Sequence, residues 1–194
     1  MDKDVCINSI FSLGLVTSGT NNSRLGTELR KMAAAYADES QILPYVRLAQ
    51  GLVNLGKGSL TLNPLYSNNL LLSNTGLAGI MIALLSFTES GSLLDGKYHF
   101  LLYSLALAIK PRAVITLDEN LNQKQISLSV GQAVDTIGIS GNPRSISGFQ
   151  TNQTPLLINI GERCELTNDD WITETPILED IVIVKEKEKP HERV

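Results

Sequence analysis

The sequence is poor in aromatic residues and in cysteine. Only 5% of the 194 residues are Phe, Trp or Tyr, and the two cysteines, Cys6 and Cys164, lie near opposite ends of the chain. This arrangement argues against a disulfide framework and a zinc ribbon, because both need clustered or repeated cysteine pairs. We therefore expect neither a disulfide-stabilised fold nor a bound metal or cofactor.

The sequence also lacks an excess of positive charge and a long apolar run. Sixteen Lys and Arg residues stand against 20 Asp and Glu residues, so the formal net charge is −4. No surplus of cations is available to follow a phosphate backbone or an anionic membrane. The apolar stretch from Leu70 to Phe87 is interrupted at Ser73–Thr75, and the remaining run is too short to span a bilayer. We expect neither nucleic-acid binding nor membrane insertion.

The character of the sequence changes near Pro111. Gly, Ala and Leu at helical spacing predominate before it, whereas short β-branched runs separated by Gly, Pro, Asn and Asp follow it. Residues 1–110 are predicted to form helices, and residues 111–185 a small antiparallel β domain, either a sandwich or an open barrel. Residues 186–194 alternate in charge and are predicted to form a solvated tail. The predicted fold class is therefore α+β.

The apolar spacing predicts several helices in the first part. Asn21, Asn22 and Ser23 precede one of them and can cap its free backbone amides. That helix is amphipathic, whereas its neighbours are apolar nearly all round, as helices enclosed by others are. The predicted helices are Val5–Ser18, Leu25–Tyr36, Leu43–Leu55, Asn68–Phe87 and Gly96–Ile109.

A short string occurs twice. LGLVTSG, which contains Gly14 and Gly19, is followed 37 residues later by QGLVNLG, which contains Gly51 and Gly56. A period of this length allows two helices and two turns, which is the unit of an α-solenoid. We expect the first glycine of each pair to let a neighbouring helix approach closely, and the second to adopt a left-handed conformation at a helix end.

One string matches a nucleotide-binding pattern. Residues 51–57 fit G-x-x-x-x-G-K, but Gly58 stands where a P-loop has Ser or Thr for magnesium. Leu52, Val53 and Leu55 would also place apolar side chains around a phosphate. A nucleotide-dependent enzyme built on this string is therefore the weakest of three hypotheses, behind a free-standing helical-repeat adaptor and the scaffold described below.

The other candidate groups are better explained by structure than by catalysis. No H-E-x-x-H, paired C-x-x-C or EF-hand string occurs. Asp118–Glu119 and Asp169–Asp170 fall at predicted turns, where carboxylates accept hydrogen bonds from backbone amides. Cys164 is expected to be an ordinary strand thiol and Trp171 a packing anchor. No catalytic, cofactor-binding or metal-ligating residue is predicted.

Several strings resemble the proteasome/cyclosome repeat family. IFSLGLVTSGTNN, from Ile10 to Asn22, looks like one of its repeats. Four later strings resemble the C-terminal part of the family's non-ATPase proteasome subunits, in the same order. They are VRLAQGL at 46–52, GQAVD at 131–135, GFQT at 148–151 and TPILE at 175–179.

This resemblance implies a non-catalytic scaffold in the base of the 19S regulatory particle of the 26S proteasome. In this family the repeats close into a toroid beside the ATPase ring. The toroid holds ubiquitin receptors, shuttle factors with ubiquitin-like domains and a deubiquitinase, in the cytoplasm and the nucleus. The chain looks like the final portion of such a subunit, so no ubiquitin-contact residue is assigned. The positions carried over are structural ones: Gly14, Gly19, Asn21, Gly51 and Gly56.

Overall fold

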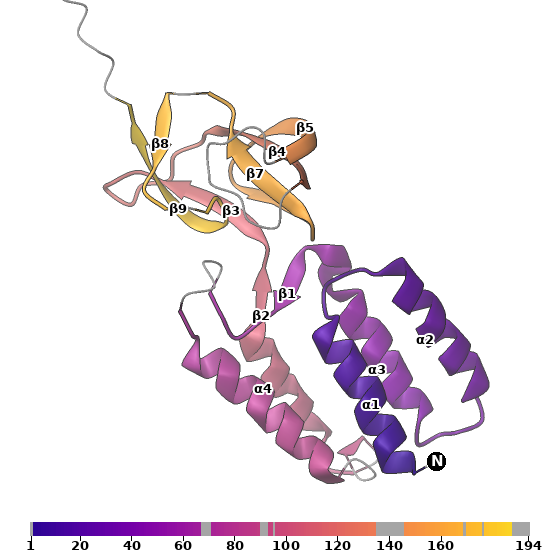
Figure 1. Cartoon of the computed structure of the whole chain (residues 1–194). Helices are drawn as coiled ribbons and strands as arrows, with labels where there is room; N and C mark the ends of the chain where they lie inside the picture. The colour runs from indigo at the N-terminus through magenta and orange to yellow at the C-terminus, as the bar shows by residue number, and fades with distance from the viewer. Residues whose placement is uncertain are drawn as a thin grey trace, which may run out of the picture. The chain divides into compact units, whose positions relative to one another are not determined.

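The computed structural model describes residues 2–66, 71–89, 93–94, 96–134, 146–168, 170–175 and 177–187 (Figure 1). These residues form helices before Pro111 and mostly strands after it, which confirms the α+β fold class. The chain divides into two compact units, Met1–Pro111 and Arg112–Val194. Most of the predicted tail, from residue 188 onward, lies outside the described residues, and Glu186 is the last residue of a strand instead.

The first unit is helical. The expected helices are present with two differences. The helix predicted over Asn68–Phe87 begins only at Asn74, because the Ser73 side chain caps it there, and residues 99–108 of the predicted α-helix Gly96–Ile109 form a 3-10 helix. This segment is apolar all round, so its pattern does not distinguish a period of 3.0 residues from one of 3.6. The helices are α1 (Lys3–Val16), α2 (Ser23–Ala35), α3 (Leu43–Val53), α4 (Asn74–Ser86) and η3 (His99–Ala108), with short 3-10 turns at η1 (Leu55–Gly58) and η2 (Phe87–Glu89).

Local side chains set the starts of these helices. The Asn22 side-chain oxygen accepts a hydrogen bond of 3.1 Å from the Leu25 amide at the start of α2, as the sequence predicts. The Ser73 hydroxyl accepts one of 3.2 Å from the Gly76 amide at the start of α4. None of the described helices is long and apolar enough to cross a membrane.

An aromatic cluster joins the helices into one core. Phe87, just after α4, stacks on Phe11 of α1 with ring centroids 3.6 Å apart. Tyr45 of α3 meets the Phe87 ring edge-on at 5.7 Å. All three rings are buried, together with side chains from α2 such as Leu29. At the other end of this unit, β1 (Leu60–Leu62) pairs antiparallel with β2 (Ile109–Pro111).

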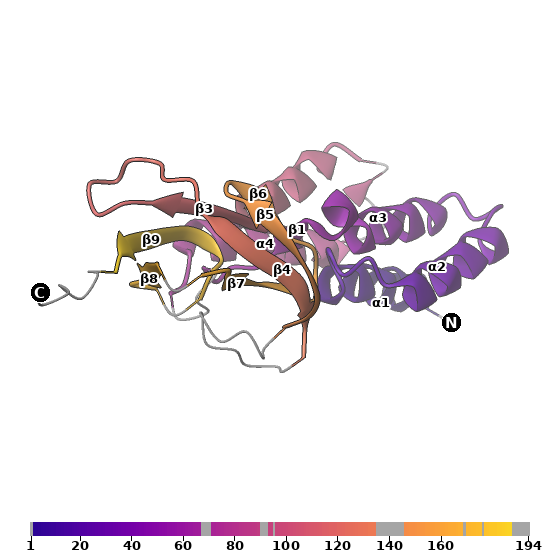
Figure 2. The same ribbon diagram turned by 90° about the horizontal axis from the view of Figure 1, so that it is seen from above.

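The second unit consists of two sheets, which form no closed barrel within the described residues (Figure 2). One has the strand order β6-β3-β9-β8 and the other β5-β4-β7. Both sheets contribute to one apolar core, in which Val114, Leu128 and Val182 are fully buried. The strands are β3 (Ala113–Leu117), β4 (Ser127–Ala133), β5 (Ile146–Gln153), β6 (Leu156–Leu157), β7 (Glu162–Leu166), β8 (Trp171–Thr173) and β9 (Asp180–Glu186).

The prediction of an antiparallel β domain is wrong for one central pair. β3 and β9 run parallel, with Val114 opposite Asp180 and Leu117 opposite Ile183. Parallel neighbours need a long crossover connection, and here the strands between them in the sequence provide it. The spacing of turns along the sequence does not reveal such a pairing, because it joins the first and the last strand of the unit.

Candidate functional site

Gly14 lies where α1 meets α3. A Cβ atom built on Gly14 would stand 2.9 Å from the Cα and 3.0 Å from the Cβ of Ala49. Real Cβ atoms are almost never this close to a backbone carbon, so only glycine allows these two helices to approach so closely. The close approach expected at this position is present.

Gly51, the matching position on α3, is different. A Cβ atom built there has no heavy atom within 4 Å, and the residue is exposed. The expectation that a helix packs closely on Gly51 is therefore wrong for this chain. The physical reason is that α3 packs through its other side, where Val46, Ala49 and Val53 are buried, while Arg47 shares the exposed side with Gly51.

The second glycine of each pair has the expected backbone conformation. Gly19 has φ +69° and Gly56 has φ +57°, both left-handed. Asn21 is also left-handed, with φ +49°, and its amide donates a 2.9 Å hydrogen bond to the Val53 carbonyl at the end of α3. A Cβ atom on either glycine would overlap Leu60, so both turns meet at the start of β1.

The string that matches a nucleotide-binding pattern forms part of a helix. Residues 51–53 are the end of α3 and residues 55–58 form the turn η1. Leu52 and Val53 point into the core, at 6% and 0% exposure. A P-loop instead follows a strand and wraps its amides around a phosphate, so the geometry here gives no phosphate site.

The acidic residues of the β unit have structural roles. The Asp118 carboxylate accepts hydrogen bonds from the backbone amides of Asn122, at 2.8 Å, and Asn120, at 2.9 Å. The hydrogen bond from Asn122 is the main reason why the pKa of Asp118 lies below its ordinary value. The Asp170 carboxylate accepts one from the Asn168 side chain at 2.7 Å, while Asp169 lies outside the described residues. Asp118 confirms the predicted turn role, whereas the Asp170 carboxylate binds a side chain and not a backbone amide.

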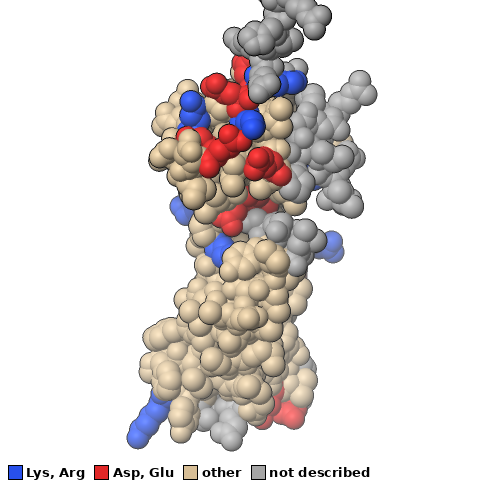
Figure 3. All heavy atoms as spheres, turned by 90° about the vertical axis from the view of Figure 1, so that its left-hand side faces the viewer, with Lys and Arg blue, Asp and Glu red and all other residues tan. Residues whose placement is uncertain are grey.

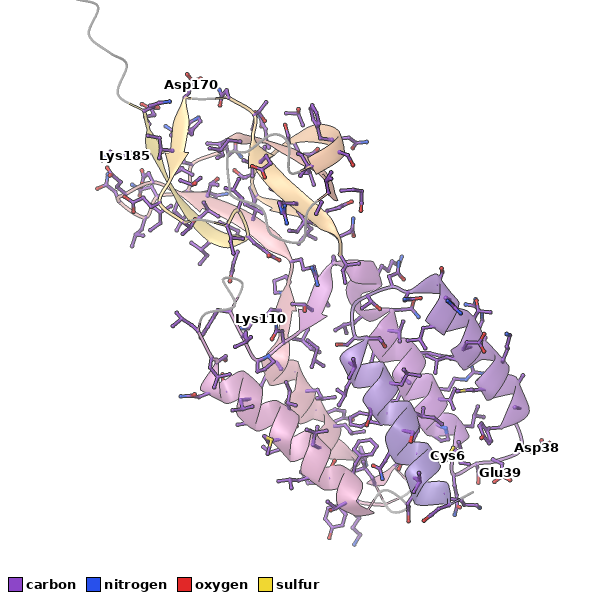
Figure 4. All side chains as sticks on the ribbon, in the orientation of Figure 1. Cys6, Asp38, Glu39, Lys110, Asp170 and Lys185 are labelled. Atoms are coloured by element: carbon purple, nitrogen blue, oxygen red, sulfur yellow. The ribbon has the colours of Figure 1, made fainter. Side chains whose placement is uncertain are left out.

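An open groove of about 170 Å³ lies beside Trp171, and four of the charged side chains that line it form two ion pairs. Lys185 forms an ion pair of 2.8 Å with Glu119, and Lys124 lies 4.0 Å from Glu186. The Lys124 ammonium is also 5.3 Å from the centre of the Trp171 ring. Figure 4 shows Lys185 at this end of the β unit. Within the described part of the chain, no three His, Cys, Asp or Glu side chains come together to hold a metal ion.

Cys164 is a buried strand thiol, as expected. It lies on β7 at 1% exposure. Burial raises its pKa to about 12, and the nearby carboxylates of Glu179, Glu162 and Glu165 add to this effect. The thiol is therefore protonated at neutral pH and shielded from reagents, which excludes a role as a nucleophile in this conformation.

Labelling with a thiol-reactive disulfide reagent tests this environment. In a Cys6→Ala variant at pH 8, Cys164 is expected to react at least roughly a thousandfold more slowly than a free thiol, because its thiolate is scarce and covered. The same sample in denaturant should react at the ordinary rate, which serves as the control. Rapid reaction of the native protein would contradict the buried position.

Helix α4 places its small residues inside. Gly76, Gly79 and Ala83 are its buried residues. A Cβ atom on Gly79 would overlap the Ser104 carbonyl of η3, and the Ser104 hydroxyl donates a 2.8 Å hydrogen bond to the Gly79 carbonyl. The two helices therefore lie side by side at backbone distance, joined through small residues.

Most large residues of α4 lie outside, whereas Ile80 packs against the core. Leu77, Met81, Leu84 and Leu85 are 37%, 48%, 43% and 62% exposed, and we call these four residues the α4 outer face. Neither α4 nor η3 contains an Asp, Glu, Lys or Arg residue. Figure 3 shows a broad surface of the helical unit without charged atoms, on the side where α4 lies in Figure 1. Surfaces of this kind are typical of protein interfaces.

Sequence reasoning missed the α4 outer face. It identified an apolar helix here but did not establish which residues would be buried. The signal that could have shown the face is the spacing of the small residues at positions 76, 79 and 83, with large apolar residues between them.

Part of the chain matches a known protein family, and nearly all of it is similar to known proteins. Residues 137–189 match the family described as 26S proteasome non-ATPase regulatory subunit RPN1 C-terminal. Over 95% of its length the chain is 47% identical to 26S proteasome non-ATPase regulatory subunit 2 homolog A of Arabidopsis thaliana. The chain is therefore similar to proteasome regulatory subunits over nearly its whole length. It is also 44% identical, over 95% of its length, to the regulatory subunit rpn1 of Schizosaccharomyces pombe.

The relatives are much longer than this chain. The aligned part covers 21% of the Arabidopsis thaliana protein and 20% of the Schizosaccharomyces pombe protein. The 26S proteasome non-ATPase regulatory subunit 2 of Dictyostelium discoideum is 42% identical to this chain over 95% of the chain's length. The aligned part covers 20% of that protein. The chain thus spans about a fifth of the length of the curated relatives it matches.

Proposed function

We propose that the chain serves as part of a non-catalytic scaffold in the base of the 19S regulatory particle, where it supports ubiquitin-dependent protein degradation. The observation that carries this proposal is the similarity to proteasome regulatory subunits over 95% of the chain. The geometry agrees with it, because the described carboxylates of the candidate turns accept backbone and side-chain hydrogen bonds and Cys164 is buried. These groups act in folding rather than in catalysis.

The helical unit is proposed to be a segment of a helical repeat. Support comes from the close approach of α1 and α3 at Gly14 and from the two left-handed turns at Gly19 and Gly56. The proposed repeat signature consists of Gly14, Gly19, Asn21, Gly51 and Gly56. In such an array, Gly51 is the position equivalent to Gly14. No described helix of this chain covers it.

The proposed partners are those of the assembled particle. They are the ATPase ring and, in the full-length subunit, ubiquitin receptors, shuttle factors with ubiquitin-like domains and a deubiquitinase. The proposed location is the cytoplasm and the nucleus. The net charge of −4 offers no cationic surplus for nucleic acid, which supports protein surfaces as the partners.

Affinity purification of the full-length subunit that contains this segment tests the proposed function. The tagged subunit should recover the ATPases of the 19S base. Gly79→Ala places a Cβ atom against the Ser104 carbonyl, so it is expected to lower this recovery severalfold. Gly26→Ala, on α2, is the matched control with full recovery, because its Cβ atom would meet only the end of the Arg30 side chain at 3.8 Å. Purification of the unaltered subunit without any base ATPase would refute the scaffold role and favour a free-standing adaptor.

A further inference from the structure

We propose that Lys110 is a latch that couples strand β2 to the start of helix α4. The Lys110 ammonium donates a 3.1 Å hydrogen bond to the Leu65 carbonyl, and it lies 4.0 Å from the centre of the Tyr66 ring. We call these two contacts the Lys110 latch. Figure 4 shows Lys110 on β2, beside the segment that leads into α4. Since β2 ends at Pro111, the last residue of the helical unit, the latch lies where the chain leaves this unit.

The Lys110 latch holds a narrow antiparallel pair of chain pieces, one after β1 and one before α4. The Tyr66 amide donates a 2.9 Å hydrogen bond to the Leu71 carbonyl, and the Ser73 amide donates one of 2.7 Å to the Pro64 carbonyl. An isolated pair of short strands is at best marginally stable in water. These two pieces therefore depend on contacts with other elements, and the latch supplies one from β2.

The same pair of chain pieces sets the start of α4. Ser73 is buried, and its hydroxyl accepts a hydrogen bond of 3.2 Å from the Gly76 amide in the first turn of the helix. A Cβ atom built on Gly76 would lie 3.5 Å from the Pro64 Cα, so this turn also packs on the piece that follows β1. Movement of the pair away from β2 would displace the cap and leave amides of the first turn without a partner.

The charge of Lys110 is met by uncharged groups. Within the described part of the chain, no Asp or Glu forms an ion pair with it. A carbonyl oxygen and the face of an aromatic ring both attract a cation, and a hydrogen bond from a charged donor is stronger than one between neutral groups. Because both contacts depend on the positive charge, removal of the charge opens the latch while an unbranched side chain can still pack in the same place.

Hydrogen exchange of single amides, measured by NMR on the whole 194-residue chain, tests the latch. The amides of Tyr66 and Ser73 are the two reporter amides, since their hydrogen bonds hold the pair together. In a Lys110→Met variant their exchange is expected to become at least roughly tenfold faster. Lys110→Arg keeps a charged donor that stacks on aromatic rings, so its exchange should stay within about threefold of that of the unaltered chain.

Two controls separate the latch from a general loss of stability. Lys124→Met is the matched variant, because Lys124 lies 5.3 Å from the centre of the Trp171 ring in the β unit, and it should leave the reporter amides unchanged. The Asn63 amide, which donates a 3.0 Å hydrogen bond to the Ala108 carbonyl, should keep its rate in Lys110→Met. Unchanged exchange at the reporter amides would overturn the proposal, as would an equal acceleration at Asn63.

A double-mutant cycle tests whether the charge and the ring act together. Tyr66→Leu alone should accelerate exchange at the Ser73 amide, because it removes the ring under the Lys110 ammonium. Adding Tyr66→Leu to Lys110→Met should have little further effect, since the contact is already lost. Full additivity of the two substitutions would show that the ammonium and the ring do not interact, and would contradict the latch.

Discussion

Replacing Phe87 with alanine is expected to lower the free energy of unfolding of the helical unit by about 3–5 kcal/mol. Phe87 is 4% exposed, stacks on Phe11 at 3.6 Å and meets Tyr45 at 5.7 Å. Removing its ring leaves a cavity between α1, α3 and the end of α4, and it also removes both aromatic contacts.

Urea unfolding followed by circular dichroism at 222 nm measures this loss, since that signal comes mainly from the helical unit. Phe149→Ala is the control, because Phe149 is 60% exposed on β5 and its truncation should change stability by no more than about 0.5 kcal/mol. A loss below about 1 kcal/mol for Phe87→Ala would show that the aromatic cluster is not the core that joins these helices.

Alanine at Gly14 and at Gly51 is expected to change stability in opposite directions. At Gly14 the added Cβ atom would stand 2.9 Å from the Ala49 Cα, so α1 and α3 must separate, which costs about 1–3 kcal/mol. At Gly51 the Cβ atom meets nothing within 4 Å, and alanine is the better helix former, which gains about 0.5–1 kcal/mol.

Each of the two alanine variants serves as the control for the other. Both glycines lie within helices and are followed by Leu and Val, so the difference in helix propensity is nearly the same and only the packing differs. Denaturant midpoints of the two variants, each compared with the unaltered chain, give the comparison. Equal destabilisation at both positions would mean that Gly51 is covered in solution, for example by another copy of the chain.

Local features of the sequence predicted much of the helical unit. Asn22 caps α2, and the two left-handed turns at Gly19 and Gly56 lie where the repeated string places them. The Asp118 turn was also predictable, since a carboxylate there binds amides two and four residues away. Each of these features depends on groups only a few residues apart, so it can be recognised in the sequence alone.

Three features could not be predicted in the same way. The parallel pairing of β3 with β9 joins the two ends of the β unit. The open side of α3 at Gly51 and the outward side of α4 at Met81 depend on which neighbour each helix finds. Apolar residues surround α4 on all sides, so hydrophobic periodicity alone does not specify an inner face, and only the spacing of its small residues indicates one.

The sequence by itself determined the α+β class, the cap of α2, the left-handed turns at Gly19 and Gly56 and the resemblance to proteasome regulatory subunits, because short-range hydrogen bonds, glycine geometry and residue order produce them. Only the tertiary structure decided that Gly14 is packed while Gly51 is open, and that α4 buries Gly79 and exposes Leu85. The physical reason is that the burial of a side chain depends on the surface that meets it, and that surface comes from a distant part of the chain or from another molecule.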